Sequence, residues 1–201
     1  RVRVFPALLA SLLLVLGGWM NVASIVGYVA SAVWLPTLGV MLALMSFGLF
    51  RLNMHLGKPH RFYRGFNNWR LSPVSREIAG VTLFFAGLAG FGFFNLFPGF
   101  PFADLLKPAS AVAGLLGLGV GGYYMIKLYR IPARPFWNHW HTDAAFVGTA
   151  FSLGGLLLAL PALAAGVLTP GLASLLATSV GAGLALEAAG LLAHARALKA
   201  A

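Results

Sequence analysis

The sequence predicts an all-α integral membrane protein, a bundle of about six transmembrane helices forming a single domain over residues 1–201. Three observations carry this prediction. The chain is 60% hydrophobic and only 9% charged, whereas a soluble domain needs about 25% charged residues to cover its surface. Its apolar residues form long continuous runs, and nearly all of its positive charge lies between those runs.

The apolar runs have the length of membrane-crossing helices. A helix needs about 20 apolar residues to cross a hydrocarbon core of about 30 Å. Six runs qualify, at residues 5–33, 35–54, 78–97, 109–127, 144–168 and 172–194. Pro36, Pro98, Pro101 and Pro170 fall in the predicted joints, where a missing backbone donor is tolerated. A transmembrane barrel would instead show segments of about 10 residues with alternating polarity.

Small residues inside the runs predict a closely packed bundle. Glycine lets helices approach each other in lipid, where apolar side chains gain little from mutual contact. The fourth and sixth runs are rich in small residues, namely Gly114, Gly117, Gly119, Gly121 and Gly122 in the fourth and Gly181, Ala182 and Gly183 in the sixth.

The net charge of +10 follows from basic loops. With six spans, every one of the 14 Lys and Arg residues except Lys107 falls on one side of the bilayer. The positive-inside rule then places both termini and both long basic loops in the cytoplasm of a bacterium or archaeon. We expect this basic face to meet anionic lipids or an acidic protein partner, and we expect no nucleic acid.

The chain has no cysteine. This excludes disulfides, thiolate zinc sites and iron–sulfur clusters ligated by the chain's own thiolates.

The most polar segment, residues 55–77, has the side chains that a quinol site needs. A quinol releases two protons with two electrons, so its site requires a titratable group that binds its oxygens and a proton path to water. His55 suits the first role, because histidine titrates near physiological pH, and Glu77 suits the second. The alternative is that both residues only cap helices and pair with loop arginines, with Ser75 as the N-cap of the third helix and Glu77 in its first turn.

The remaining polar residues favour no metal or haem site. His139 and His141 resemble a metal pair, but residues two apart diverge on a helix and no third ligand is evident nearby in the sequence. We expect this segment to be an aromatic, basic loop leading to a helix capped by Thr142 or Asp143. All five histidines lie at span ends or in loops, which does not favour haem. Glu187 lies within a span and is expected to form an interhelical hydrogen bond, with a proton relay to His194 as the alternative.

Two loops give the sequence a family resemblance. The first reads His55-Leu56-Gly57-Lys58-Pro59 with Arg61, followed by Ser-x-x-Ser-Arg-Glu over residues 72–77, and the second covers residues 129–137 and continues to Thr142. These segments resemble the membrane-anchor subunit of dimethyl-sulfoxide-reductase-type molybdoenzymes (DmsC-like), over approximately residues 35–155. Members of that family typically have about eight spans, whereas about six are predicted here.

The resemblance implies a function in anaerobic or alternative respiration. The chain would hold an iron–sulfur subunit and a molybdopterin catalytic subunit at the membrane. It would oxidise quinol or reduce quinone (menaquinone or ubiquinone), while the terminal substrate reacts on the catalytic subunit. The resemblance assigns quinol binding and proton transfer to His55, Glu77, Arg61 and Arg76. Lys58, Arg64, Tyr129 and Trp137 would support them.

Two other functions compete with this one. A purely structural anchor would assemble the complex without a working quinone site. A small-solute or ion transporter would have broken helices and polar residues at mid-membrane depth. The sequence has only Glu187 and a few asparagines of that kind and no internal repeat.

Overall fold

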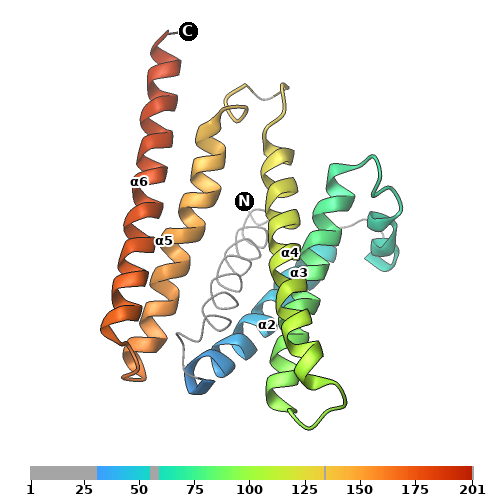
Figure 1. Cartoon of the computed structure of the whole chain (residues 1–201). Coiled ribbons are helices and arrows are strands. Elements are labelled where there is room, and N and C mark those ends of the chain that lie inside the picture. Colours follow the sequence, from blue (N-terminus) through green and yellow to red (C-terminus); the bar gives the residue numbers. More distant parts are fainter. Residues whose placement is uncertain (1–30, 55–58, 134, 201) are drawn as a thin grey trace. The chain divides into compact units, whose positions relative to one another are not determined.

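The computed structural model describes residues 31–54, 59–133 and 135–200 of the chain, and every regular element in them is helical. The elements are α2 (Ser31–Asn53), the 3₁₀ helix η1 (Pro59–Phe66), α3 (Pro73–Leu96), α4 (Ala103–Tyr129), α5 (Trp140–Ala164) and α6 (Pro170–Ala200) (Figure 1). Five of them are long and apolar enough to cross a membrane. The prediction of an all-α membrane protein is confirmed. Nearly all of the first predicted span, residues 5–33, lies outside the described residues.

One predicted joint is wrong. Pro36 was placed between two spans, but α2 begins at Ser31 and contains Pro36. Proline is tolerated inside membrane helices when nearby side chains satisfy the freed backbone groups. Pro36 leaves the Ala32 carbonyl without its helical donor, and the Thr37 hydroxyl adds a bond to the next carbonyl, that of Val33, at 2.7 Å. The helix therefore runs through the position at which the sequence indicated a break.

The described residues form two compact units, one ending at Tyr124 and the other beginning at Met125. The prediction of a single domain stays a prediction. In the first unit α2 packs on α3, with the Trp34 ring 5.3 Å from the Phe91 ring. Gly92 of α3 leaves the space that Leu38 of α2 fills, because a Cβ added at Gly92 would lie 2.9 Å from the Leu38 side chain.

Glycines bring α3 and α4 into backbone contact in the same unit. A Cβ added at Gly80 would overlap the backbone of Gly121, and one at Gly87 would overlap the backbone of Gly114. A Cβ at Gly117 would overlap the backbone of Phe84. The spacing of these residues along each helix keeps them on one face, as in small-residue contacts between membrane helices.

The second unit contains the antiparallel pair α5 and α6, which run side by side in Figure 1. Their turn includes Gly166, whose φ of 68° is readily adopted by glycine. Small residues again set the contact, since a Cβ at Gly183 would lie 2.5 Å from both the Gly148 carbonyl oxygen and the Ser152 nitrogen. The Ser152 hydroxyl donates to Glu187 across this contact at 3.1 Å, which confirms the predicted interhelical hydrogen bond.

Replacing Gly117 by alanine should weaken the α3–α4 contact, because the new methyl group would overlap the Phe84 backbone. Overpacking of this kind costs about 1–3 kcal/mol. The matched control is Gly119→Ala on the same helix, where a Cβ meets nothing within 4 Å. Alanine there should be neutral or stabilising by about 1 kcal/mol through helix propensity. Thermal unfolding in detergent, followed by circular dichroism, compares the two variants, and equal melting temperatures would contradict the contact.

Candidate functional site

The residues predicted to bind quinol do not all fall in the described part of the chain. His55 and Lys58 lie outside the described residues. Arg61 and Arg64 lie on η1 with exposed side chains. η1 itself packs against the start of α3, since a Cβ at Gly65 would lie 2.8 Å from the Ile78 side chain. η1 therefore packs against α3 at Ile78, the residue that directly follows Glu77.

The start of α3 differs from the prediction. Ser72, not Ser75, is the N-cap: it has extended backbone angles, and its hydroxyl accepts the Ser75 amide at 3.3 Å. Pro73 takes the first helical position, where its missing N–H leaves no bond unmade. Ser75 is buried within the helix, and Glu77 lies beyond the first turn. Both Ser72 and Ser75 fit the cap preference, and the position of Pro73 explains why the first one caps the helix.

Arg76 ties the loop to the bundle through all three of its guanidinium nitrogens. Nε donates to the carbonyl of Trp69 at 2.8 Å, and Nη2 donates to the carbonyl of Arg70 at 2.5 Å. Nη1 donates to the Tyr124 hydroxyl of α4 at 2.8 Å, and the guanidinium carbon lies 5.2 Å from the centre of that ring. The fixed fork of arginine suits such a set of acceptors. Arg76 thus holds the loop by hydrogen bonds to its backbone.

Glu77, next to Arg76, is half-buried near the N-terminal end of α3. Among the arginines whose side chains the structure describes, none forms a salt bridge with Glu77, and the salt bridge found there joins Arg130 to Asp143. The alternative in which Glu77 only pairs with loop arginines finds no support in this part of the chain. A half-buried carboxylate of this kind is able to accept a hydrogen bond and a proton from a bound hydroxyl group.

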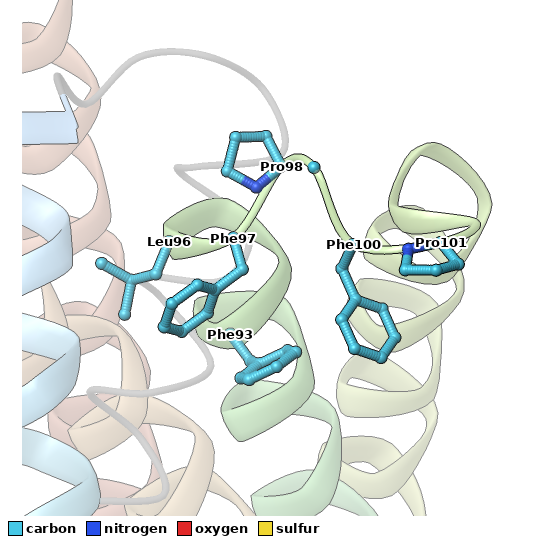
Figure 2. Close-up of a pocket in the computed structure, with 7 residues that line it drawn as sticks. Phe93, Leu96, Phe97, Pro98, Phe100 and Pro101 are labelled. Carbon is cyan, nitrogen blue, oxygen red and sulfur yellow. The ribbon is translucent and has the colours of Figure 1, made fainter.

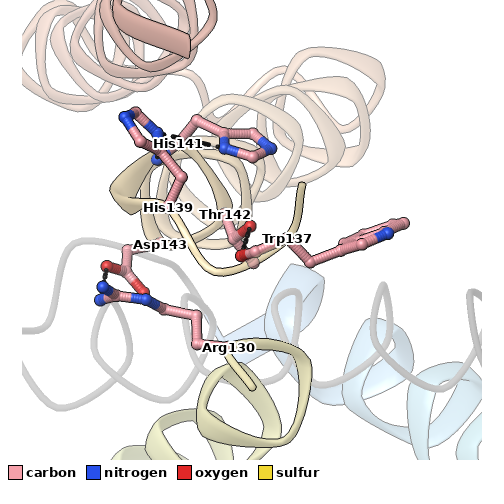
Figure 3. Close-up of polar contacts among 6 residues, drawn as sticks. All are labelled: Arg130, Trp137, His139, His141, Thr142 and Asp143. Atoms are coloured by element: carbon pink, nitrogen blue, oxygen red, sulfur yellow. Dashed lines mark hydrogen bonds and ion pairs between the residues drawn. The ribbon is translucent and has the colours of Figure 1, made fainter. Parts of the chain in front are cut away.

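The supporting residues of the second basic loop gather in the second unit. The Tyr129 ring lies 5.6 Å from the Trp137 ring and 5.4 Å from the Phe146 ring. Beside them Arg130 forms its salt bridge with Asp143 at 2.5 Å (Figure 3). Aromatic and basic side chains of this type are typical of the membrane–water interface.

The start of α5 also corrects the prediction. Neither Thr142 nor Asp143 is the N-cap, because His139 takes that position with φ −138° and ψ 152° and its Nδ1 accepts the His141 amide at 3.1 Å. The Thr142 hydroxyl donates instead to the carbonyl of Trp137 at 2.7 Å (Figure 3). Thr142 and Asp143 therefore hold the preceding loop rather than the helix amides.

Histidines 139, 141 and 194 form a cluster that the sequence reasoning missed. His139 lies before the helix in extended backbone, so its ring does not diverge from that of His141, and their Nδ1 atoms are 3.3 Å apart. His194 of α6 stacks on His141 with ring centres 3.9 Å apart. The prediction that His139 and His141 have no third ligand nearby is wrong, because the fold brings His194 to them. The sequence did contain one indication of this contact. Two consecutive spans joined by a short turn run antiparallel, so the last turns of α6 lie beside the first turns of α5.

An open apolar pocket lies at the other end of α3. Its walls are the aromatic and proline side chains of the α3–α4 loop (Figure 2). Phe93 of this pocket lies about 24 Å along the helix axis from Glu77, at about 1.5 Å per residue. The pocket has no titratable residue in its lining. It is therefore separate from Glu77.

Comparison with known proteins identifies the family. The family model described as DMSO reductase anchor subunit (DmsC) matches residues 6–200. The chain belongs to the DmsC family. It is also similar to the C subunit of anaerobic dimethyl sulfoxide reductase from Haemophilus influenzae, at 36% identity over 119 residues. That alignment covers 59% of this chain and 42% of the relative. No solved structure matches.

Family membership confirms the resemblance seen in the two basic loops, and with the five apolar helices it supports integration in the membrane. The aligned part of this DmsC-family protein amounts to less than half of the relative's length.

Arg76→Lys should loosen the first basic loop of this DmsC-family protein, since one ammonium group cannot replace three forked hydrogen bonds. Amide hydrogen exchange, read by mass spectrometry, should speed up over residues 67–72. Tyr124→Phe removes one of the three bonds and should have a smaller effect. Arg64→Lys, at an exposed position, is the matched control. Unchanged exchange in Arg76→Lys would contradict the role of Arg76 in holding the loop.

Proposed function

We propose that this DmsC-family protein is the membrane-anchor subunit of a molybdopterin oxidoreductase complex and exchanges electrons between the quinone pool and an iron–sulfur partner subunit. Glu77 is the observation on which the quinol site rests. It is a half-buried carboxylate near the N-terminal end of α3, with no salt-bridge partner among the described side chains, and it is next to an arginine that fixes the adjoining loop. The family match supports the anchor role.

In the proposed reaction, quinol gives quinone, two protons and two electrons. His55 binds one quinol oxygen, and His55 and Glu77 take up the departing protons and pass them to water, as general bases do. Arg61 and Arg76 support the site, and Arg76 does so by keeping the loop in place. The reverse reaction uses the same groups to deliver protons to a bound quinone.

The electrons must pass to a cluster held by the partner subunit, because the sequence contains no cysteine to ligate one. The molybdopterin subunit then acts on the terminal substrate. We assign the protein to the cytoplasmic membrane of a bacterium or archaeon.

The basic loops are the proposed docking surface for the partner subunit. If each described long helix crosses the membrane, the end of α2, the start of α3, the end of α4, the start of α5 and the end of α6 share one side. Those ends contain Arg76, Arg130 and Lys199, among other cations. Complementary charge on a partner would orient it and speed its encounter with the anchor. The positive-inside rule assigns this side to the cytoplasm.

The competing functions are less well supported. The five described long helices are continuous, whereas a transporter is expected to have broken helices around a midplane site. Glu187, the acidic residue in the interior of a span, is bonded to Ser152 in the helix interface. The purely structural anchor remains an outcome of the test below.

The test is reduction of the partner's iron–sulfur clusters by a quinol analogue, in membranes that contain the whole complex. His55→Ala and Glu77→Gln should each lower the rate roughly tenfold or more, which corresponds to about 1.4 kcal/mol of activation free energy. His60→Gln is the control, because His60 is an exposed histidine on η1 outside the proposed site. Co-purification of the three subunits checks assembly for each variant.

Each outcome has a separate meaning. If the variants assemble and keep the wild-type rate, quinol binds elsewhere in the bundle. If the wild-type complex neither oxidises quinol nor reduces quinone, the protein is a structural anchor.

A further inference from the structure

Three histidines from two helix ends converge in the second unit. His139 caps α5, His141 lies in the first turn of α5, and His194 lies near the C-terminal end of α6. One ring nitrogen from each lies within 4.8 Å of the others. Figure 3 shows the His139 and His141 rings close together, on the side of the loop away from Trp137. The convergence brings residues more than 50 positions apart in sequence to one point.

His194 is the residue that points to a ligand. Its side chain is buried, with 8% of its surface exposed, and neither ring nitrogen has a hydrogen-bond partner. Buried polar side chains almost always have a partner, and an exception calls for an explanation. The unpaired ring lies 3.9 Å from the His141 ring and 5.2 Å from the His139 ring. Its missing partner is therefore to be sought in the space that the three rings share.

Packing around the cluster fixes the histidines in place. Gly190, one turn before His194, lies so close to α5 that a Cβ there would be 2.7 Å from the Ala144 methyl carbon and 3.2 Å from the His141 Cα. Phe136 also contacts the cluster, with its ring 4.5 Å from the His194 ring in an edge-to-face arrangement. Two helices and an aromatic ring thus keep the three imidazoles together. Because the His141 and His194 rings are stacked, one of them must rotate before both can direct a nitrogen at a single ion.

We propose that His139, His141 and His194 bind a divalent first-row transition metal ion of the zinc class. Neutral imidazoles are preferred ligands for such ions, and three of them with one open position form a known type of zinc site. With metal–nitrogen distances of about 2.05 Å, a tetrahedral site separates its nitrogens by about 3.3 Å. The His139 and His141 Nδ1 atoms are already 3.3 Å apart.

The neighbouring groups favour this ion over others. Calcium and magnesium need several oxygen ligands, but the closest carboxylate in sequence, Asp143, is paired with Arg130. Ligation by His139 displaces its bond to the His141 amide, because a neutral imidazole has only one unprotonated nitrogen. Bound metal would thus join the end of α6 to the start of α5. This site is independent of the quinol reaction proposed above.

The experiment measures metal binding by the full-length protein in lipid nanodiscs, purified with an affinity tag free of histidine. Co²⁺ serves as the optical probe and Zn²⁺ as the competitor. Wild type should bind one Co²⁺ with tetrahedral ligand-field bands, and Zn²⁺ should displace it. His141→Gln and His194→Gln should each weaken binding roughly tenfold or more. His60→Gln, at an exposed histidine in the first unit, should bind as wild type does.

A second measurement separates loss of binding from loss of folding. Zn²⁺ should raise the melting temperature of wild type and of His60→Gln, and it should leave that of His139→Gln unchanged. Phe136→Leu keeps all three histidines and should retain the Zn²⁺-induced rise. The proposal is overturned if wild type binds no Co²⁺ at micromolar concentrations, if His194→Gln binds as wild type does, or if His60→Gln loses binding to the same extent.

Discussion

Direct backbone contact between helices at glycine is the constraint on which the described structure depends. Within lipid, apolar side chains gain little by leaving one apolar surrounding for another, so helix pairs are held by close packing and by the few polar bonds between them. α3 and α4 meet where Gly80 faces Gly121 and Gly87 faces Gly114, and α5 and α6 meet where Gly148 faces Gly183. At each of these points a methyl group would occupy the space of a neighbouring backbone.

These contacts position the polar residues at the helix ends. Arg76 reaches the Tyr124 hydroxyl because α3 and α4 touch about one helical turn away, at Gly80 and Gly121. His194 stacks on His141 because Gly190 brings α6 against the first turns of α5. The same kind of packing thus supports two chemically different ends, one with a carboxylate and a fixed guanidinium group and one with three imidazoles.

The polar groups inside the helix contacts have a structural explanation, whereas two titratable groups at the helix ends do not. Glu187 is bonded to Ser152, and Ser179 donates to the Phe151 carbonyl, so these groups have partners within the α5–α6 contact. Glu77 and His194 lack such partners among the described residues. A buried titratable group without a hydrogen-bond partner destabilises the folded protein unless a ligand or a water molecule bonds to it. This contrast is the physical basis for assigning ligand roles to the helix ends.

The sequence by itself determined the fold class, the membrane location, the approximate bounds of the five described spans and the family, because hydropathy, charge sorting and loop motifs are local properties of the chain. It also determined that Glu187 would bond between helices, since an acidic residue in lipid requires a partner. Only the tertiary structure decided that Pro36 lies inside α2, that Ser72 and His139 cap their helices, and that His194 joins His139 and His141. Caps depend on backbone angles, and the histidine cluster depends on which turns of two antiparallel helices come to lie at the same depth. Neither can be read from residue spacing along one segment.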